Sequence, residues 1–324
     1  MRVSVRALGI FLAVCLGVLA LGSFQGSYAG VKRRIFGPMC AEGLSKVSVG
    51  PASPGDAHHA CMRVASEAGR PVIVNLHQWS ADFTEINASV LKYAISNDLN
   101  LIIPNLYGPN NSPQACGSDD VMNDVDAAID FVEIAGKSQG AKVVMIGVSG
   151  GGYTALNHVY RGKRRADYYS IWVPITDLGS WHRQSVSRGL KYADDIKKCT
   201  GLDTAEMRKR SPMTYASSME MPETPILLAA GARDGHGPFA VPITHTLNIF
   251  DVWATKTGAE AISAEERSNL LTLNYDQPDI TDPAKALLLG RAGNAQLLIF
   301  DGGHEMLEDF ALSEVSNFLE PPAS

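Results

Sequence analysis

Residues 143–156 constrain the fold of this chain more than any other stretch. They read Val-Val-Met-Ile-Gly-Val-Ser-Gly-Gly-Gly-Tyr-Thr-Ala-Leu. A short apolar run rich in β-branched residues stops at Gly147, and a helix-compatible segment over residues 153–160 follows the glycines. This pattern predicts a strand, a sharp turn and a helix. With Ser149 at the apex, the residues two before and two after it must be almost free of side chain, and Gly147 and Gly151 meet that demand.

In this context G-x-S-x-G is the pattern of the nucleophile elbow of α/β-hydrolases. The alternative is a phosphate-binding loop, which needs either G-x-G-x-x-G or a lysine followed by serine or threonine after the glycines. The glycine run here ends at Tyr153 and supplies neither. We therefore expect Ser149 to be a nucleophile rather than part of a phosphate site.

The first 29 residues have the composition of a secretory signal peptide. Arg2 and Arg6 precede an apolar run over residues 7–21, and small residues lead to Ala29. We expect cleavage after Ala29 and a secreted or periplasmic protein. An uncleaved membrane anchor is the alternative, but the apolar run is shorter than the ~20 residues that a span needs.

Residues 30–324 are expected to form a single catalytic domain. Removal of the signal peptide takes away two arginines and no acidic residue, so the formal charge moves from −6 to −8. Such an acidic surface argues against nucleic acid or an anionic membrane as the partner. No later segment is apolar enough to cross a bilayer, so we expect no stable membrane insertion after cleavage.

Four cysteines remain after signal cleavage, and in an exported chain they suggest two disulfides. Order along the chain favours Cys40 with Cys61 and Cys116 with Cys199, although three connectivities are possible. A zinc site is the weaker alternative, because no pair has C-x-x-C spacing.

Strands and helices alternate along the chain. Apolar runs predict strands at residues 71–76, 101–104, 142–146, 168–173, 225–231 and 296–300, and helices are expected at 87–97, from 118 to 132, and at 153–160, 242–253 and 306–319. Two antiparallel strands are expected near 46–49 and 61–65, a cap or lid at 175–212, and a charged, irregular insertion at 260–289. The order predicts an α/β-hydrolase fold, with a mostly parallel doubly wound sheet, helices on both faces and a small cap insertion.

Three residues in the order nucleophile, acid, histidine each follow a predicted strand: Ser149, Asp234 and His304. A serine hydroxyl needs a base to take its proton, and the base needs a third group to fix its tautomer and stabilise its charge. Because the carboxyl ends of parallel strands share one edge, these side chains are expected to meet there. We interpret them as a catalytic triad, whose chemistry requires no metal and no organic cofactor.

Other residues compete for these roles. Asp177 follows the preceding strand and Asp301 lies on the same turn as His304, but Asp234 follows the strand that ordinarily supplies the acid. His77 is interpreted as a structural histidine of the loop after the third strand, and His236 as a loop residue beside the acid.

The oxyanion hole is expected to use two backbone N–H groups. One is that of Gly150, immediately after the nucleophile, and the other comes from the loop that begins at His77. This loop usually reads His-Gly-x, and here Gln78 replaces the glycine. Either Gln78 or Trp79 could donate, and we favour Trp79, although it could also be only a packing residue.

Six short motifs stand out along the chain: Leu-His-Gln-Trp-Ser-Ala-Asp (76–82), Gly-Pro-Asn (108–110), Gln-Ala-Cys-Gly-Ser (114–118), Gly-Val-Ser-Gly-Gly-Gly (147–152), Trp-Val-Pro-Ile-Thr-Asp (172–177) and Asp-Gly-His (234–236). In these motifs the sequence resembles secreted single-domain hydrolases related to the prolyl oligopeptidase catalytic domain. The resemblance covers most of residues 71–250 and the final histidine motif. It implies a serine hydrolase with Ser149, Asp234 and His304 as its triad. The chain has no room for the β-propeller of prolyl oligopeptidases, which puts peptide specificity in doubt.

Two functions therefore stand as hypotheses: a serine hydrolase that acts on a small ester or peptide, and a catalytically silent binding module. The intact triad favours the hydrolase. Trp79, Tyr153 and Trp181 lie close to the catalytic loops in sequence and, together with Gln78, are the candidate substrate-binding residues. An aromatic-lined, open cleft suits an apolar acyl or alcohol group, so ester cleavage is favoured and prolyl-oligopeptidase-like peptide cleavage is the alternative.

Overall fold

The structure is a computed structural model that describes residues 39–50, 58–237, 241–276 and 285–320. The expected signal peptide, residues 1–29, lies outside the described residues. The chain divides after Cys40 into two units, and the architecture below is that of the second, Ala41–Ser324.

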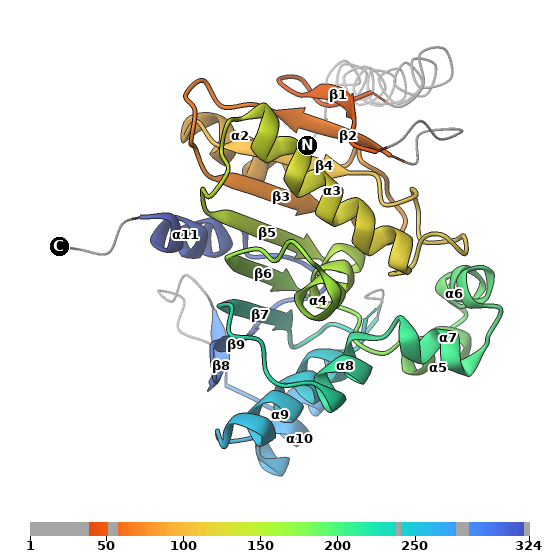
Figure 1. Cartoon of the computed structure of the whole chain (residues 1–324). Coiled ribbons are helices and arrows are strands. Elements are labelled where there is room, and N and C mark those ends of the chain that lie inside the picture. Colours follow the sequence, from red (N-terminus) through yellow and green to blue (C-terminus); the bar gives the residue numbers. More distant parts are fainter. Residues whose placement is uncertain (1–38, 51–57, 238–240, 277–284, 321–324) are drawn as a thin grey trace, which may run out of the picture. The chain divides into compact units, whose positions relative to one another are not determined.

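A nine-stranded sheet organises the described part of this unit (Figure 1). Its spatial order is β1-β2-β4-β3-β5-β6-β7-β9-β8. The strands are β1 (Ser45–Ser48), β2 (His59–Arg63), β3 (Val72–Leu76), β4 (Asn100–Pro104), β5 (Val143–Val148), β6 (Tyr168–Trp172), β7 (Ile226–Gly231), β8 (Ala286–Ala292) and β9 (Ala295–Phe300). The six central strands, β4-β3-β5-β6-β7-β9, pair in parallel. Strands β1 and β2 at one edge and β8 at the other edge pair antiparallel. The mostly parallel sheet and the early antiparallel pair are confirmed.

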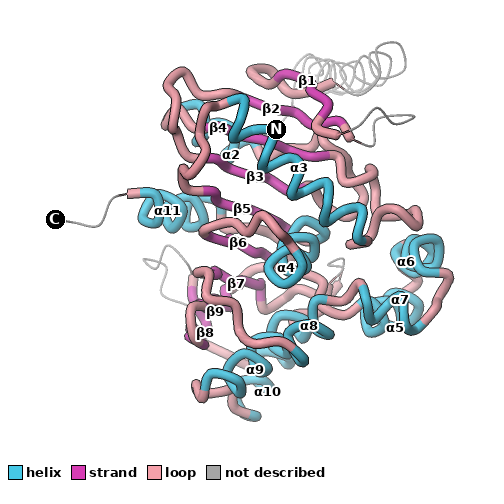
Figure 2. The backbone as a smooth tube through the Cα atoms, viewed as in Figure 1, coloured by secondary structure: helices cyan, strands magenta, loops and turns pink. Residues whose placement is uncertain are grey.

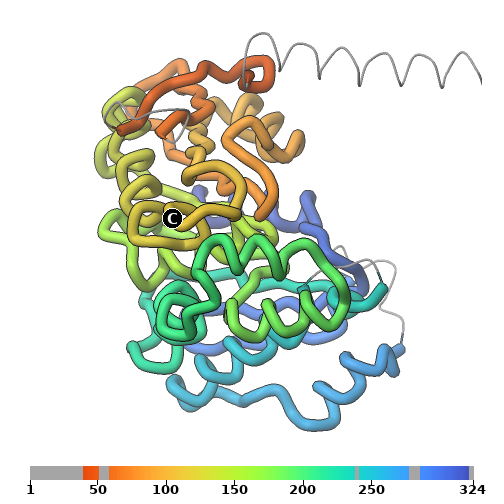
Figure 3. The backbone as a smooth tube through the Cα atoms, turned by 90° about the vertical axis from the view of Figure 1, so that its right-hand side faces the viewer, coloured from red at the N-terminus to blue at the C-terminus, as the bar shows by residue number. Residues whose placement is uncertain are grey.

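Helices cover both faces of the sheet. The helices of the described residues are α2 (Ala88–Ser96), α3 (Asp119–Ala135), α4 (Gly150–Arg161), α5 (Leu178–Ser187), α6 (Tyr192–Thr200), α7 (Thr204–Lys209), α8 (Pro212–Ser218), α9 (Thr244–Thr257), α10 (Ala264–Thr272) and α11 (Glu308–Leu319). Helices α2 and α11 pack together on one face, and α3, α4, α8 and α9 follow one another on the other face (Figures 1 and 3). This arrangement is the doubly wound architecture that the alternation of strands and helices predicts.

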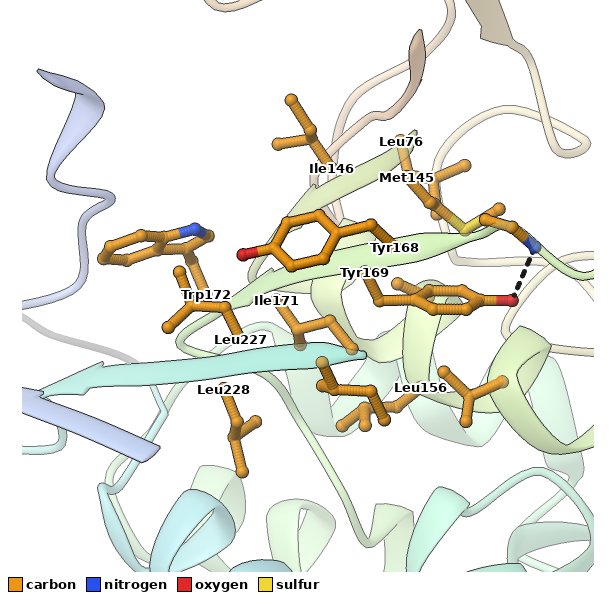
Figure 4. Packing of buried hydrophobic residues seen from close by; sticks show 14 of the residues in the cluster. Leu76, Met145, Ile146, Leu156, Tyr168, Tyr169, Ile171, Trp172, Leu227 and Leu228 are labelled. Carbon is orange, nitrogen blue, oxygen red and sulfur yellow. Dashed lines mark hydrogen bonds between the residues drawn. The ribbon is translucent and has the colours of Figure 1, made fainter. Parts of the chain in front are cut away.

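The core lies on the central strands. Every residue of β3, β6 and β7 is buried, because a parallel strand covered on both faces exposes neither row of its side chains. Figure 4 shows Trp172, Ile146 and Leu227 within this packing. The buried hydroxyl of Tyr169 accepts a hydrogen bond from the Ala166 N–H at 3.2 Å.

The charged segment 260–289 is more regular than expected. It contains α10, which starts with a capping box between Ser263 and Glu266, and the edge strand β8. Leu270 is the one buried residue of α10, so the apolar periodicity that marks most helices is almost absent. The prediction of an irregular insertion was wrong for these two elements, and residues 277–284 lie outside the described chain.

The segment expected to form a cap, 175–212, contains α5, α6 and α7. These helices lie beyond the carboxyl ends of the central strands (Figure 1). The loop 105–117, between β4 and α3, has no helix or strand, as its Asn, Pro and Gly content predicts (Figure 2). Among the described residues, no helix is both long enough and apolar enough to span a membrane.

Candidate active site

Ser149 lies at the apex of the turn between β5 and α4, with φ 58° and ψ −115°. A positive φ is uncommon for a residue with a side chain and persists only where the surroundings enforce it. Here the Ser149 N–H donates to the Trp172 carbonyl at 2.9 Å, and the Ser149 carbonyl accepts from the Tyr153 N–H at 2.8 Å. The strained backbone is therefore held on both sides.

The flanking glycines allow strand and helix to pass this closely. A Cβ added at Gly147 would lie 2.3 Å from the Gly151 carbonyl oxygen, and one at Gly151 would lie 2.2 Å from the Leu76 carbonyl oxygen. Any side chain at either position would force the elbow open. The spacing of the glycines around Ser149 thus has the steric cause inferred from the sequence.

Asp234 and His304 are joined directly. His304 Nδ1 lies 2.7 Å from Asp234 Oδ2, and the Asp234 residue is only 2% exposed. Burial raises the pKa of Asp234, and the hydrogen bond from His304 opposes that rise. The Val241 N–H also donates to Asp234 Oδ1, at 3.3 Å. The carboxylate is thus positioned to hold the imidazole with its Nε2 turned away from Asp234.

The loops that carry Asp234 and His304 are tied backbone to backbone. The Arg233 N–H donates to the Gly302 carbonyl at 2.9 Å, and a Cβ at Gly231 would lie 2.2 Å from the Gly303 carbonyl oxygen. Two residues far apart in sequence therefore keep a fixed relation at the carboxyl edge of the sheet.

The competing acids have other partners. Asp177 is the N-cap of α5, and its Oδ1 accepts from the Ser180 N–H at 2.5 Å. Asp301 forms an ion pair with Arg233. His77 is buried, with ring nitrogens 2.8 Å from the carbonyl oxygens of Gln78 and Asn105, a geometry suited to shaping the loop that contains it.

Ser149 is not hydrogen-bonded to His304 among the contacts of the described residues, but its neighbour Val148 and His304 line the same cavity. Catalytic hydrogen bonds are often long before substrate binds and tighten in the complex. The structure joins Asp234 to His304 and places Ser149 at the same edge of the sheet.

The backbones of Gly150 and Trp79 adjoin each other. A Cβ at Gly150 would lie 2.3 Å from the Trp79 backbone nitrogen. The Gln78 N–H donates to Glu85 Oε2 at 2.8 Å, whereas the N–H groups of Trp79 and Gly150 have no acceptor in the described part of the chain. This difference favours Trp79 over Gln78 as the second oxyanion donor.

The aromatic candidates pack against one another instead of lining open space. Trp79, Tyr153 and Trp181 are at most 2% exposed. Their rings meet at centroid distances of 4.7 Å (Trp79–Trp181) and 5.7 Å (Trp79–Tyr153). The Tyr153 hydroxyl has two carbonyl acceptors within reach, that of Cys116 at 2.9 Å and that of Arg210 at 2.7 Å. In this arrangement Tyr153 and Trp181 pack against Trp79 and do not line the cavity, whereas Gln78 is exposed beside it.

These aromatic side chains belong to a second, small core, separate from the main one. It consists of Trp79, Cys116, Tyr153, Ile175, Leu178, Trp181, Ile196, Cys199 and Val241. It joins the loop that begins at His77 and the helix α4 to α5 and α6. The cap segment is therefore anchored to the candidate active site by packing.

The disulfide between Cys116 and Cys199 lies in this second core, with its Cα atoms 6.1 Å apart. This pairing confirms the prediction from chain order, and Cys40 and Cys61 are disulfide-bonded as well. The bridge joins residues separated by 83 positions.

We expect the double variant Cys116→Ala/Cys199→Ala to unfold with a free energy lower by about 2–4 kcal/mol, because the bridge restricts the unfolded chain. Urea unfolding of the oxidised proteins measures the difference. Reduced wild-type protein is the control, although its other bridge is opened too. An unchanged midpoint, or free thiols at both positions in unreduced peptide maps, would contradict the prediction.

Sequence analysis did not identify Asn75 and Glu85, which line the cavity next to His304. Asn75 interrupts the apolar run Pro-Val-Ile-Val-Asn-Leu at 71–76. A polar residue inside a fully buried strand was the available signal for Asn75. Glu85 had no comparable signal, because the hydrogen bond between its carboxylate and the Gln78 N–H forms only when the loop is folded.

Comparison with known proteins gives one curated relative and several solved structures. No family model matches the chain. The curated relative, acylamino-acid-releasing enzyme 1 of Oryza sativa subsp. japonica, is 26% identical over 203 residues, which are 56% of this chain and 24% of that protein. The chain thus spans about a quarter of the length of this relative.

Solved structures extend the likeness over most of the chain. Acylaminoacyl peptidase of Pyrococcus horikoshii superposes with a TM-score of 0.58 at 15% identity, covering 85% of this chain and 41% of its own. A puromycin-hydrolyzing peptidase of Mycobacterium tuberculosis gives 0.57 at 15% identity, covering 85% and 38%. Esterase B of Lactobacillus rhamnosis gives 0.51 at 14% identity, covering 76% and 82%. Together with the sheet order and the elbow, these likenesses show that the chain has the α/β-hydrolase fold.

Proposed function

We propose that this protein is a serine hydrolase that cleaves an ester or amide bond through an acyl-enzyme on Ser149. The observation that carries the proposal is the strained Ser149 at the elbow, on the same sheet edge as a buried Asp234 bonded to His304. A binding module would have no need of a serine held at positive φ or of a carboxylate buried against a histidine.

The proposed mechanism follows from this geometry. His304 Nε2 takes the Ser149 proton as Oγ attacks the acyl carbon, and then gives that proton to the leaving group. Asp234 keeps the Nδ1 proton on His304 and stabilises the imidazolium. Water then attacks the acyl-enzyme with His304 again as the base, which restores Ser149.

The N–H groups of Gly150 and Trp79 would stabilise the oxyanion. Their adjacency and their lack of acceptors among the described residues support this role. Preorganised donors of this kind commonly supply the largest single share of such catalysis. The bond from the Gln78 N–H to Glu85 would hold the loop in place.

Ester cleavage is the reaction that we favour. An alcohol leaves more easily than an amine, so a site able to cleave an amide also cleaves the matching ester, whereas the converse does not hold. Peptide cleavage is the second candidate, because the names of the similar proteins include peptidases as well as an esterase.

A panel of nitrophenyl esters of increasing chain length and of proline-containing peptide amides tests this preference. We expect Ser149-dependent turnover of the esters to exceed that of the amides by about a hundredfold or more in kcat/KM, since each tenfold reflects about 1.4 kcal/mol in the barrier. Labelling by a fluorophosphonate probe reports the active nucleophile. Peptide amides cleaved as fast as esters would instead support the peptidase.

We further propose that the chain is exported and related to the prolyl oligopeptidase family. The two disulfides are compatible with an oxidising compartment, and residues 1–29 would be the export signal. Residues 30–324 would form one catalytic domain, with 175–212 as its cap.

A further inference from the structure

A cavity of about 350 Å³ lies directly beside His304. It is bounded by the oxyanion loop at Gln78, by Val148 just before the nucleophile, and by the starts of α2 and α11. The volume falls at the lower end of the range for small-molecule pockets. Since a cavity of about 150 Å³ already accepts a benzene ring, this one has room for a leaving group of about a dozen heavy atoms.

Asn75 lines this cavity from within the sheet. It is 7% exposed, and its side chain has no hydrogen bond to any described residue. Asn75 is in register with Ile146, so it faces the same side of the sheet as Val148, two residues further along β5. Because Asn75 borders the cavity, its amide is open to that space and is free to pair with a polar group of a ligand there.

Three carboxylates also line the cavity: Glu85, Glu305 and Glu308. None of the lining residues, all of which are described, is a lysine or arginine. All three glutamates are hydrogen-bonded. Glu85 accepts from the Gln78 N–H at 2.8 Å, Glu305 accepts from the Gly303 N–H at 3.0 Å, and Glu308 accepts from Asn87 Nδ2 at 2.6 Å and from the Ser89 hydroxyl. The partial positive charge at the N-terminus of α2, and likewise of α11, is equivalent to roughly half an elementary charge. Together they offset about one of the three carboxylate charges, so the cavity remains negative.

We propose that this cavity is the leaving-group subsite and that it selects polar leaving groups that are neutral or cationic. The inference rests on the proposed function, in which His304 protonates the departing atom. As the Ser149 Oγ–acyl bond forms and the bond between the acyl carbon and the leaving atom breaks, the serine proton passes through His304 to that atom. The leaving group therefore lies within reach of His304, whose side chain borders the cavity.

The lining determines the selection. The Asn75 amide both donates and accepts, so it recognises a hydroxyl or ammonium group on the departing alcohol or amine. The glutamates attract a cation and repel a carboxylate. Glu305 and Glu308 are exposed, so salt screens their effect and the selection is strongest at low ionic strength. Leaving groups that carry an anion are disfavoured.

Three butyrate esters, which share their acyl group and differ in the leaving alcohol, test the selection. The first is the dimethylaminoethyl ester, which is cationic at neutral pH. The second is its neutral isostere, isoamyl butyrate, and the third is the anionic carboxyethyl ester. We expect kcat/KM to fall in that order, with about tenfold or more between the cationic and anionic esters at low salt. Asn75→Leu should lower kcat/KM for the cationic ester by about tenfold relative to isoamyl butyrate.

The variant Glu305→Gln/Glu308→Gln tests the charge without depending on Asn75. Each glutamine keeps one carbonyl oxygen, which suffices for the bond from the Gly303 N–H and for the one from Asn87 Nδ2, while the second acceptor that Glu308 offers to the Ser89 hydroxyl is lost. The preference for the cationic over the anionic ester should shrink towards one. Asp309→Asn is the matched control, because Asp309 is exposed in the same first turn of α11 and does not line the cavity. It should leave the preference unchanged.

The outcomes separate this inference from the proposed function. Ser149-dependent turnover with no charge preference, or an Asn75→Leu effect equal for all three esters, overturns the leaving-group subsite alone. A wild-type protein that neither turns over any ester or amide nor reacts with a fluorophosphonate overturns the proposed function, and the subsite with it.

Discussion

Ser149→Ala is expected to lower kcat by about a millionfold while leaving the fold intact. The size follows from other serine triads, in which removal of the nucleophile leaves only the contribution of the oxyanion hole and of binding. Folding should be preserved because alanine keeps the Cβ at the same strained φ of 58°. The lost hydroxyl makes no capping bond to α4, so the free energy of unfolding should change by no more than about 0.5 kcal/mol.

Nitrophenyl ester hydrolysis and fluorophosphonate labelling measure the loss, and urea unfolding checks the fold. Ser187→Ala, at an exposed serine of α5, is the control and should be labelled as well as the wild type. Labelling of the Ser149→Ala variant at the wild-type rate would mean that another residue is the nucleophile.

The central architecture was predictable because its elements carry strong local signals. Buried parallel strands read as continuous apolar runs, and the glycines around Ser149 mark a turn that few other sequences could form. The weak signals were at the periphery. Helix α10 buries only Leu270, so the helical period is almost absent from it. Strand β8 reads Ala-Leu-Leu-Leu-Gly-Arg-Ala, in which apolar and polar residues do not alternate, although its exposed residues, Leu289 and Arg291, lie on one face.

The candidate site was predictable as a set of residues but not as a surface. Sequence order placed Trp79, Tyr153 and Trp181 near the catalytic loops, yet it could not show that their rings would pack on one another. Their burial is a tertiary property set by α5 and the Cys116–Cys199 bridge. The same limit hid Glu85, whose contact with the Gln78 N–H exists only once the loop has folded.

Asp234→Asn is expected to depress kcat by about ten-thousandfold with little change in stability. An asparagine can place an N–H against His304 Nδ1, which would fix the wrong tautomer, and it cannot stabilise the imidazolium. The stability cost should be small, because burial already disfavours the ionised form and raises the pKa of Asp234. A neutral amide removes that desolvation penalty as it removes the charge-assisted bond.

Asp177→Asn is the matched control, since it makes the same chemical change at the rival acid. Its role is to cap α5 through the Ser180 N–H, and asparagine caps a helix about as well as aspartate. Turnover should therefore change by less than about tenfold, because the helix end keeps its partner. Steady-state kinetics of both variants decide the assignment: a larger loss in Asp177→Asn than in Asp234→Asn would move the acid to the start of the cap. The 2.7 Å bond between Asp234 and His304 would then be structural.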